Sequence, residues 1–248
     1  MFRIMIILMS FMLTNSILAS TVSEMYCNNQ MVIGLSAGPT WTSGNEKQTF
    51  NLQPDIVKTY TADDNHHTFP SAELFLGWQS HLSLAQQPVL SQLGISIAAA
   101  DHANLSGDIW EDADPTFDNF NYTYKVNHAH VAVKGRLIGN DNFIVEPYIS
   151  ASVGIGFNRA YDFTIDPKIS EEVPAPAFQS NTTTTFSYTL GIGIQKSFTP
   201  QLQAAIGYEF ADWGKTQLSR APGQTLNQGL TLDHLYAHQL QLSLFFLV

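Results

Sequence analysis

The sequence predicts an all-β protein: an eight-stranded antiparallel up-and-down transmembrane β-barrel with short periplasmic turns and four long outer loops. Three observations predict it. Apolar residues recur at every second position in eight segments, and the intervening positions are mainly Gly, Ser, Thr and Gln. The connections between these segments are alternately long and short. Only 13% of the residues are charged, against roughly 25% in an ordinary soluble domain, while 44% are hydrophobic.

The composition also argues against several classes of protein. With 16 Phe, 9 Tyr and 4 Trp, the chain is too aromatic for an intrinsically disordered protein. Its formal net charge of −10 argues against nucleic acid as a partner, because nucleic-acid binding requires a basic surface. The single Cys excludes a disulfide framework and a cysteine-based zinc site. We expect no cofactor.

The first twenty residues have the pattern of a secretory signal peptide. Arg3 supplies the positive start, residues 4–13 are apolar apart from Ser10, and Ala19 offers a cleavage site. A single membrane anchor would need about 20 spanning residues, and this apolar run is shorter. We therefore expect a signal peptide over 1–20, a short periplasmic lead over 21–30 and the barrel domain over 31–248.

Alternation identifies the predicted strands in chain order. The first strand alternates apolar residues from Met31 to Trp41 with small residues such as Gly34 and Ser36. The last strand, which ends the chain, has an apolar residue at every second position up to Val248. The eight predicted strands span 31–41, 69–83, 91–104, 121–138, 143–163, 186–198, 202–218 and 235–248.

The connections support a barrel independently of the strands. The short ones are 84–90, 139–142 and 199–201, and the last two contain turn-forming Gly, Asn, Asp and Pro. The long ones are 43–68, 105–120, 164–181 and 219–234. Strict alternation of this kind is typical of a barrel with periplasmic turns and outer loops, and it places both termini on the periplasmic side.

The nature of the second face indicates which face is inside. A soluble β-barrel or sandwich, the competing fold, would direct charged residues outward, whereas here the face opposite the apolar one is small, polar and almost uncharged. Such a face suits a narrow lumen. Tyr236 and Phe246 bracket an apolar band roughly 25 Å high, which matches the thickness of an outer-membrane belt between aromatic girdles. We therefore expect Leu190, Ile192, Leu242 and Leu244 to face lipid.

With these strands and loops, the chain resembles the small eight-stranded outer-membrane barrels of the OmpA, OmpX and opacity-protein type over about residues 31–248. The carboxy-terminal strand is the most specific part of the resemblance. It resembles the signal that such barrels offer to the barrel assembly machinery, with Val248 in place of the usual final aromatic residue. The residues of this signal are Leu240, Leu242, Leu244, Phe246 and Val248. The resemblance implies the bacterial outer membrane, with its lipids and lipopolysaccharide as surroundings.

Charged residues on the inward face form the strongest candidate site. We interpret them as a structural network that closes the lumen, with a gate or a catalytic cluster as alternatives. Pairing Leu137 with Phe143 across a tight turn would set Lys134 opposite Glu146, which makes this the best-specified ion pair. The expected members of the network are Glu73, Lys134, Arg136, Glu146, Glu209, His102, His128 and His130.

Metal binding is the weaker interpretation of the candidate ligands. His128 and His130 share a face, with His102 as a possible third ligand, but lumenal hydrogen bonding is the simpler role and we expect no metal. The segment 105–120 is rich in Asp and Glu and has no Lys or Arg, which predicts a solvated acidic loop rather than a calcium site.

Function is then expected at the outer surface. We expect no enzymatic activity, and we expect the outer loops to serve contact or adhesion, with a host or matrix ligand, or the barrel to serve envelope integrity. A narrow gated pore for small solutes is the alternative, although an eight-stranded lumen is only wide enough for side chains. A lipid A-modifying enzyme is less favoured, although His238 lies near the outer aromatic girdle.

Overall fold

The computed structural model describes residues 29–248, apart from residues 45, 64–66, 85–86 and 140–143. The predicted signal peptide, most of the predicted lead and Phe143 lie outside the described residues. No helix in the described part of the chain is long and apolar enough to cross a membrane.

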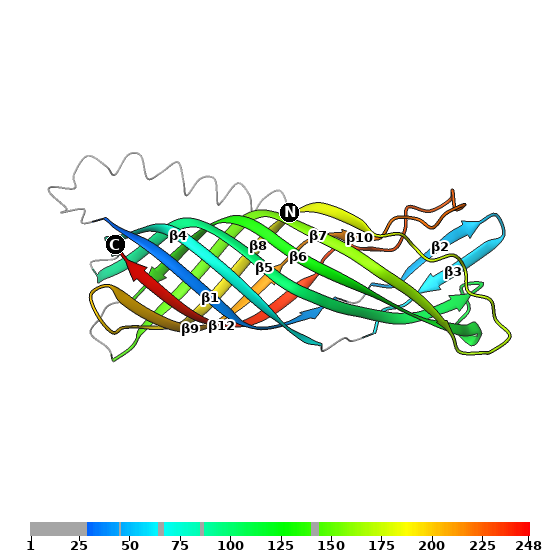
Figure 1. Cartoon of the computed structure of the whole chain (residues 1–248), viewed down its shortest axis with the longest axis horizontal. Coiled ribbons are helices and arrows are strands. Elements are labelled where there is room, and N and C mark those ends of the chain that lie inside the picture. Colours follow the sequence, from blue (N-terminus) through cyan, green and yellow to red (C-terminus); the bar gives the residue numbers. More distant parts are fainter. Residues whose placement is uncertain (1–28, 45, 64–66, 85–86, 140–143) are drawn as a thin grey trace.

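Eight long strands form one closed antiparallel ring (Figure 1). Each strand pairs with its neighbours in chain order, and the last pairs with the first, so that Leu247 lies opposite Val32. The ring confirms the predicted fold class, and closure leaves no free edge in this part of the sheet. The strands are β1 (Gln30–Ser43), β4 (Thr68–Leu84), β5 (Gln87–Glu111), β6 (Asp118–Ile138), β7 (Glu146–Pro167), β8 (Asn181–Ser197), β9 (Leu202–Asp212) and β12 (Tyr236–Leu247).

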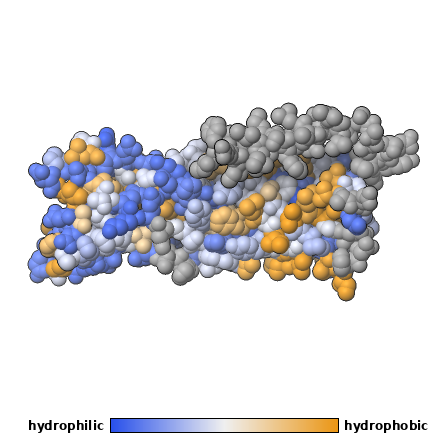
Figure 2. All heavy atoms as spheres, turned by 180° about the vertical axis from the view of Figure 1, so that it is seen from behind, coloured by the Kyte–Doolittle hydropathy of each residue, from blue (hydrophilic) through white to orange (hydrophobic). Residues whose placement is uncertain are grey.

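Alternation places an apolar belt on the outside of the ring. Leu190, Ile192, Leu242 and Leu244 are 55%, 61%, 66% and 46% exposed, whereas their neighbours on the other face, apart from the buried Phe245, are small or polar. Figure 2 shows hydrophobic residues gathered over one half of the barrel wall and hydrophilic residues over the opposite end. The four leucine and isoleucine side chains therefore point outward as expected, and their contact with lipid remains a prediction.

The strands of the outer half extend much further than the sequence predicted. Segment 105–120 was expected to be a loop, but β5 continues to Glu111, β6 begins at Asp118, and the short 3-10 helix η3 (Pro115–Phe117) lies between them. The reason is a β-bulge between Ala100 and Ala103, which reverses the inward and outward parity of β5. Beyond the bulge the apolar residues occupy the opposite set of alternate positions and face inward. A strand followed with one fixed parity therefore ends at the bulge, although the real strand continues.

Other strand boundaries also differ from those predicted. Strand β9 ends at Asp212, not at 218, because Trp213 turns into the interior and Gly214 follows with a φ of 70°. The long connection 43–68 contains the hairpin of β2 (Gln48–Gln53) and β3 (Ile56–Tyr60), and β3 pairs with the tip of β5. The connection 219–234 contains β11 (Thr231–Leu232), which pairs with β10 (Thr216–Gln217).

The interior changes character along the barrel axis. Inside the apolar belt the lumen is filled mainly by Gln, Ser, Thr and charged residues, with a small apolar cluster around Phe75, Tyr148 and Phe245. Beyond the belt, the extended strands and the β2–β3 hairpin enclose an apolar core like that of a soluble domain. Its aromatic members are Tyr60, Phe69, Phe120, Tyr122, Tyr124, Phe163, Phe178 and Trp213.

Candidate functional site

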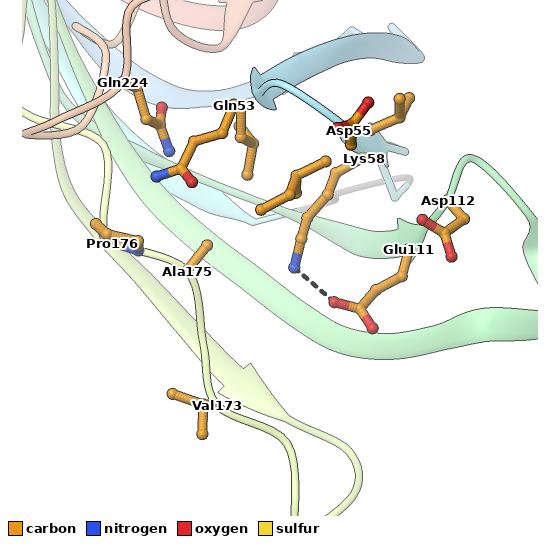
Figure 3. Close-up of a pocket in the computed structure, with 12 residues that line it drawn as sticks. Gln53, Asp55, Lys58, Glu111, Asp112, Val173, Ala175, Pro176 and Gln224 are labelled. Carbon is orange, nitrogen blue, oxygen red and sulfur yellow. Dashed lines mark hydrogen bonds and ion pairs between the residues drawn. The ribbon is translucent and has the colours of Figure 1, made fainter.

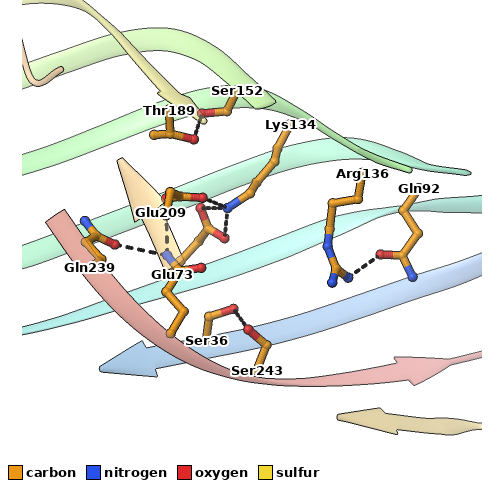
Figure 4. Close-up of polar contacts among 11 residues, drawn as sticks. Ser36, Glu73, Gln92, Lys134, Arg136, Ser152, Thr189, Glu209, Gln239 and Ser243 are labelled. Carbon is orange, nitrogen blue, oxygen red and sulfur yellow. Dashed lines mark hydrogen bonds and ion pairs between the residues drawn. The ribbon is translucent and has the colours of Figure 1, made fainter. Parts of the chain in front are cut away.

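The lumen is closed at its periplasmic end by a layer of glutamines around a stacked arginine. The Arg136 guanidinium lies 4.2 Å from the ring centre of Tyr148 and 4.1 Å from that of Phe245, a cation–π sandwich. Its Nη1 donates to Gln92 Oε1 at 2.7 Å (Figure 4). Gln92 in turn donates to Gln79 at 2.8 Å. The layer therefore holds a buried cation between two aromatic rings without a directly bonded carboxylate, and Arg136 Nη2 has no hydrogen-bond partner among the described residues.

A three-membered ion cluster fills the next layer (Figure 4). Lys134 Nζ donates to Glu73 Oε1 at 2.7 Å and Oε2 at 2.9 Å, and to Glu209 Oε2 at 2.7 Å. All three side chains are no more than 5% exposed. Gln241 adds a donor to Glu209 Oε1 at 3.2 Å. Removing Lys134 would leave two buried carboxylates without their cation, which is strongly destabilising.

The predicted pair between Lys134 and Glu146 is wrong. Leu137 lies opposite Ile149, not Phe143, and Lys134 lies opposite Ser152. The cause is the connection, since β6 ends at Ile138 and β7 begins only at Glu146, so the assumed tight turn does not set the register. Glu146 instead accepts from Gln195 at 3.4 Å and from Ser197 at 3.5 Å, near the periplasmic end.

Two histidines and a tryptophan form the layer above the ion cluster. His128 stacks on Trp213 with ring centres 4.3 Å apart and planes 6° apart. Its Nδ1 is 2.6 Å from Asn158 Oδ1, and its Nε2 is 2.9 Å from His130 Nδ1. Neither Asn158 nor Trp213 was singled out from the sequence. Parity was the signal that could have found them, because Asn158 shares the inward positions of its predicted strand with Glu146, and Trp213 shares those of its predicted strand with Glu209.

The hydrogen bonds of this layer fix both tautomers. Asn158 uses its Nδ2 to donate to two main-chain carbonyls, those of Trp213 and Lys215, each at 2.8 Å. Its Oδ1 must therefore accept from His128 Nδ1–H, which makes His128 Nε2 the acceptor for His130 Nδ1–H. His130 Nε2 is then a bare lone pair, buried without a partner among the described residues. The hydrogen bonds therefore account for three of the four ring nitrogens.

Contrary to the prediction, His102 does not belong to the lumenal network. It lies at the bulge in β5, which turns Ala103 inward in its place. Its side chain is 36% exposed, and its Nδ1 is 2.9 Å from Asp101 Oδ1. Within the described residues, no three His, Cys, Asp or Glu side chains are placed to hold a metal ion.

Little free space remains inside the barrel. Around the ion cluster and His130, the cavities lined by described residues have volumes of about 10 Å³ each, and one beneath the outer core has about 20 Å³. Each is about the size needed for one water molecule. The lumen is thus packed along the layers that the structure describes.

A larger pocket of about 360 Å³ opens at the outer end, and we call it the outer pocket (Figure 3). It lies between the β2–β3 hairpin, the tip of β5, and two outer segments around 173–176 and Gln224. The residues that line it are Leu52, Gln53, Asp55, Ile56, Val57, Lys58, Glu111, Asp112, Val173, Ala175, Pro176 and Gln224. No sequence pattern marked it, because it assembles four segments distant in the chain.

Lysines from other segments pair with carboxylates of the acidic segment 105–120. Lys58, buried beneath the outer pocket, donates to Glu111 Oε1 at 2.8 Å. Partial burial alone would raise the pKa of Glu111, but the hydrogen bonds from Lys58 and Asn119 and the lysine charge bring it below its usual value. Lys168 bridges Asp108 at 2.8 Å and Asp118 at 2.6 Å. Burial opposes its charge, yet these two bonds raise the pKa of Lys168.

Comparison with known proteins reveals resemblance in fold only. No protein-family model matches the chain, and no curated protein matches it. Among solved structures, Neisserial surface protein A is 9% identical, with 87% of this chain and 96% of that chain covered and a TM-score of 0.44. The Yersinia pestis attachment invasion locus protein Ail is 12% identical, with 90% and 100% covered and a TM-score of 0.35. The Escherichia coli outer membrane protease OmpT is 7% identical, with 91% and 99% covered and a TM-score of 0.43.

The barrel itself has the features of a membrane-spanning protein. Only structures that satisfy every backbone hydrogen bond internally can span a bilayer, and a closed ring of strands does so. An apolar belt surrounds this ring, and its lumen is polar and packed. The fold is that of a bacterial outer-membrane β-barrel protein. In such barrels the end with short turns is periplasmic and the end with long connections faces the outside of the cell.

Proposed function

We propose that this barrel is a closed, non-enzymatic surface protein whose outer end makes contacts with molecules outside the cell. One observation carries the proposal: β5, β6 and β7 run past the apolar belt and support a polar outer end with its own apolar core, above a lumen filled with side chains. A core of this kind holds the outer segments in place. Binding residues are commonly carried by outer segments that a rigid scaffold positions.

The exposed surface of the outer end supports a contact role. It combines several carboxylates with apolar side chains that are exposed far from the belt. Isolated apolar residues on a surface are ordinary, but Ile56 and Val173 line the outer pocket, which favours recognition of another molecule there. The exposed apolar residues at this end are Ile56, Phe117, Ile169, Val173 and Leu226.

Adhesion of intact cells tests the proposal. Cells with and without the gene are applied to a panel of host and matrix ligands, together with cells that produce a Phe117→Ser, Val173→Ser variant. We expect adhesion to require the gene and to weaken in the variant, with surface amounts of both forms measured in parallel. If the deletion strain adheres equally but becomes sensitive to detergents, the role in envelope integrity replaces the contact role.

Planar-bilayer conductance tests the alternative of a narrow gated pore. The cavities of about 10 Å³ around the lumenal ion cluster speak against continuous passage. We expect the purified barrel to give no stable channel. A reproducible, wide conductance in the unmodified protein would contradict the closed lumen.

One arrangement favours the second candidate, an acyl hydrolase acting on lipid A or other lipids. On the outward face at the outer rim, Ser43 Oγ is 3.3 Å from His238 Nε2, and Tyr208 Oη is 2.6 Å from His238 Nδ1. A phenol can orient the imidazole, but it stabilises the protonated ring less than a buried carboxylate does. We therefore rank it second. Mass spectra of lipid A from cells with the protein, without it and with its Ser43→Ala variant decide the matter. The same lipid A with and without the protein excludes lipid A as substrate.

A further inference from the structure

One end of the outer pocket carries carboxylates that nothing in the described structure neutralises. Asp55 and Asp112 line the pocket, and neither side chain has a hydrogen bond or ion pair with any described residue. Glu111, beside them, is already bonded to Lys58 and to Asn119. The positive charge of Lys58 is therefore used within the wall. This end of the pocket attracts a cation.

The opposite end presents a fixed hydrogen-bond donor. The Gly229 main-chain N–H donates to Asn227 Oδ1 at 2.9 Å, which leaves Asn227 Nδ2 to donate to Gln224 Oε1, also at 2.9 Å. The amide of Gln224 is thereby oriented, and its Nε2 has no acceptor among the described residues. Gln224 is only 4% exposed, and Figure 3 shows its amide nitrogen directed into the pocket. A buried donor of this kind suits a carbonyl oxygen.

The walls between the two ends are apolar. Leu52 and Ile56 contribute from the hairpin, and Val173, Ala175 and Pro176 from the facing segment. A long aliphatic stem buries its methylene groups well against such walls while its charged head remains at a polar end. The volume of about 360 Å³ lies near the lower limit of ligand pockets, so the pocket suits a side chain with its adjoining backbone.

We propose that the outer pocket binds a lysine or arginine side chain within a peptide segment of a partner protein. The cationic head lies at Asp55 and Asp112, the stem lies against the apolar walls, and a backbone carbonyl accepts from Gln224 Nε2. This deepens the proposed contact function and rests on it, since it names the class of partner that the outer end recognises.

Peptide binding to the full-length barrel in lipid nanodiscs tests the proposal. The probe is a fluorescein-labelled peptide Gly-Ser-Arg-Ser-Gly, measured by anisotropy beside versions with Lys, citrulline or Glu in place of Arg. Citrulline preserves the shape of arginine without its charge. We expect the Arg or Lys peptide to bind at least tenfold more tightly than the citrulline peptide, the Glu peptide not to bind, and binding to weaken with salt.

Variants of the pocket locate the binding. Asp55→Asn combined with Asp112→Asn removes both charges, and Asn tolerates the positive φ angles of 66° and 49° at these positions. Asp166→Asn, on the same outer end but outside the pocket, is the matched control. We expect the double variant to bind the Arg peptide at least tenfold more weakly and the control to bind as the parent does. Equal binding by parent and double variant overturns the proposal, as does binding of Ca²⁺ alone without any peptide.

Cell adhesion distinguishes failure of this proposal from failure of the contact function. Adhesion lost on deletion of the gene but retained in the double variant overturns the pocket as the contact site and leaves the contact function intact. Adhesion unaffected by deletion overturns the contact function. Adhesion lost in the deletion strain and in the double variant, together with weakened peptide binding by the double variant, supports the pocket proposal and the contact function.

Discussion

At the scale of single residues, alternation predicts a direction but not a partner. Lys134, Glu73 and Glu209 all lie inside the lumen, where the period of two placed them. Their contacts join three strands, and so they depend on the register of each strand pair around the ring. The register of β6 and β7 depends on the geometry of the connection between them, from residue 138 to residue 146. No simple turn motif in this segment specifies that geometry. The predicted partner, Glu146, is wrong for this reason.

Stability measurements can distinguish the observed partners of Lys134, Glu73 and Glu209, from the partner that the sequence predicted, Glu146. Lys134→Met should lower the free energy of unfolding by about 3–5 kcal/mol, because it strands two buried carboxylates. Adding Glu73→Gln and Glu209→Gln should recover part of the loss, whereas adding Glu146→Ala should be additive with it. Unfolding in urea measures each variant. Equal coupling of Lys134 to Glu146 and to Glu73 would contradict the observed register.

At the scale of elements, the sequence predicted the eight strands well within the belt and poorly beyond it. Inside the belt each strand meets lipid on one face and a polar lumen on the other, so alternation is clear from residue to residue. Beyond the belt, the bulge at Ala100–Ala103 reverses parity, and the strands surround an apolar core instead. A bulge leaves no reliable mark in composition. The β2–β3 hairpin, the tip of β5 and the outer pocket were therefore outside what the pattern could show.

The attachment of this hairpin should depend on pH. Only three residue pairs join β3 to β5, and one of them carries the ion pair between Lys58 and Glu111. Because the pKa of Glu111 is lowered on folding from its usual 4.5, its contribution is present above pH 4.5 and is lost as the pH falls through the folded value. We expect hydrogen exchange of the Lys58 to Tyr60 amides to accelerate below that pH. Glu111→Gln should exchange faster at neutral pH and lose this pH dependence. A variant with the same acid response as the parent would assign the response to another carboxyl group.

At the scale of the whole molecule, two environments meet along one barrel. The belt half is apolar outside and polar inside, and the outer half has the reverse arrangement around its core. Strands β5, β6 and β7 run from the belt into the outer half, where β3 pairs with β5, so the outer end is built on the same sheet as the belt. A closed lumen and a supported outer surface are thus two consequences of one continuous sheet.

Two exposed leucines test where the membrane ends. Leu242 lies in the belt and is 66% exposed, while Leu226 lies at the outer end and is 51% exposed. In water both would tolerate arginine, since each side chain is already outside the core. In a bilayer, Leu242→Arg should lower the free energy of unfolding by about 2–4 kcal/mol, because the charge enters the hydrocarbon region. Leu226→Arg should change it by less than about 0.5 kcal/mol, as for other surface substitutions. Urea unfolding in lipid vesicles measures both, and equal small effects would show that the belt does not lie in the membrane.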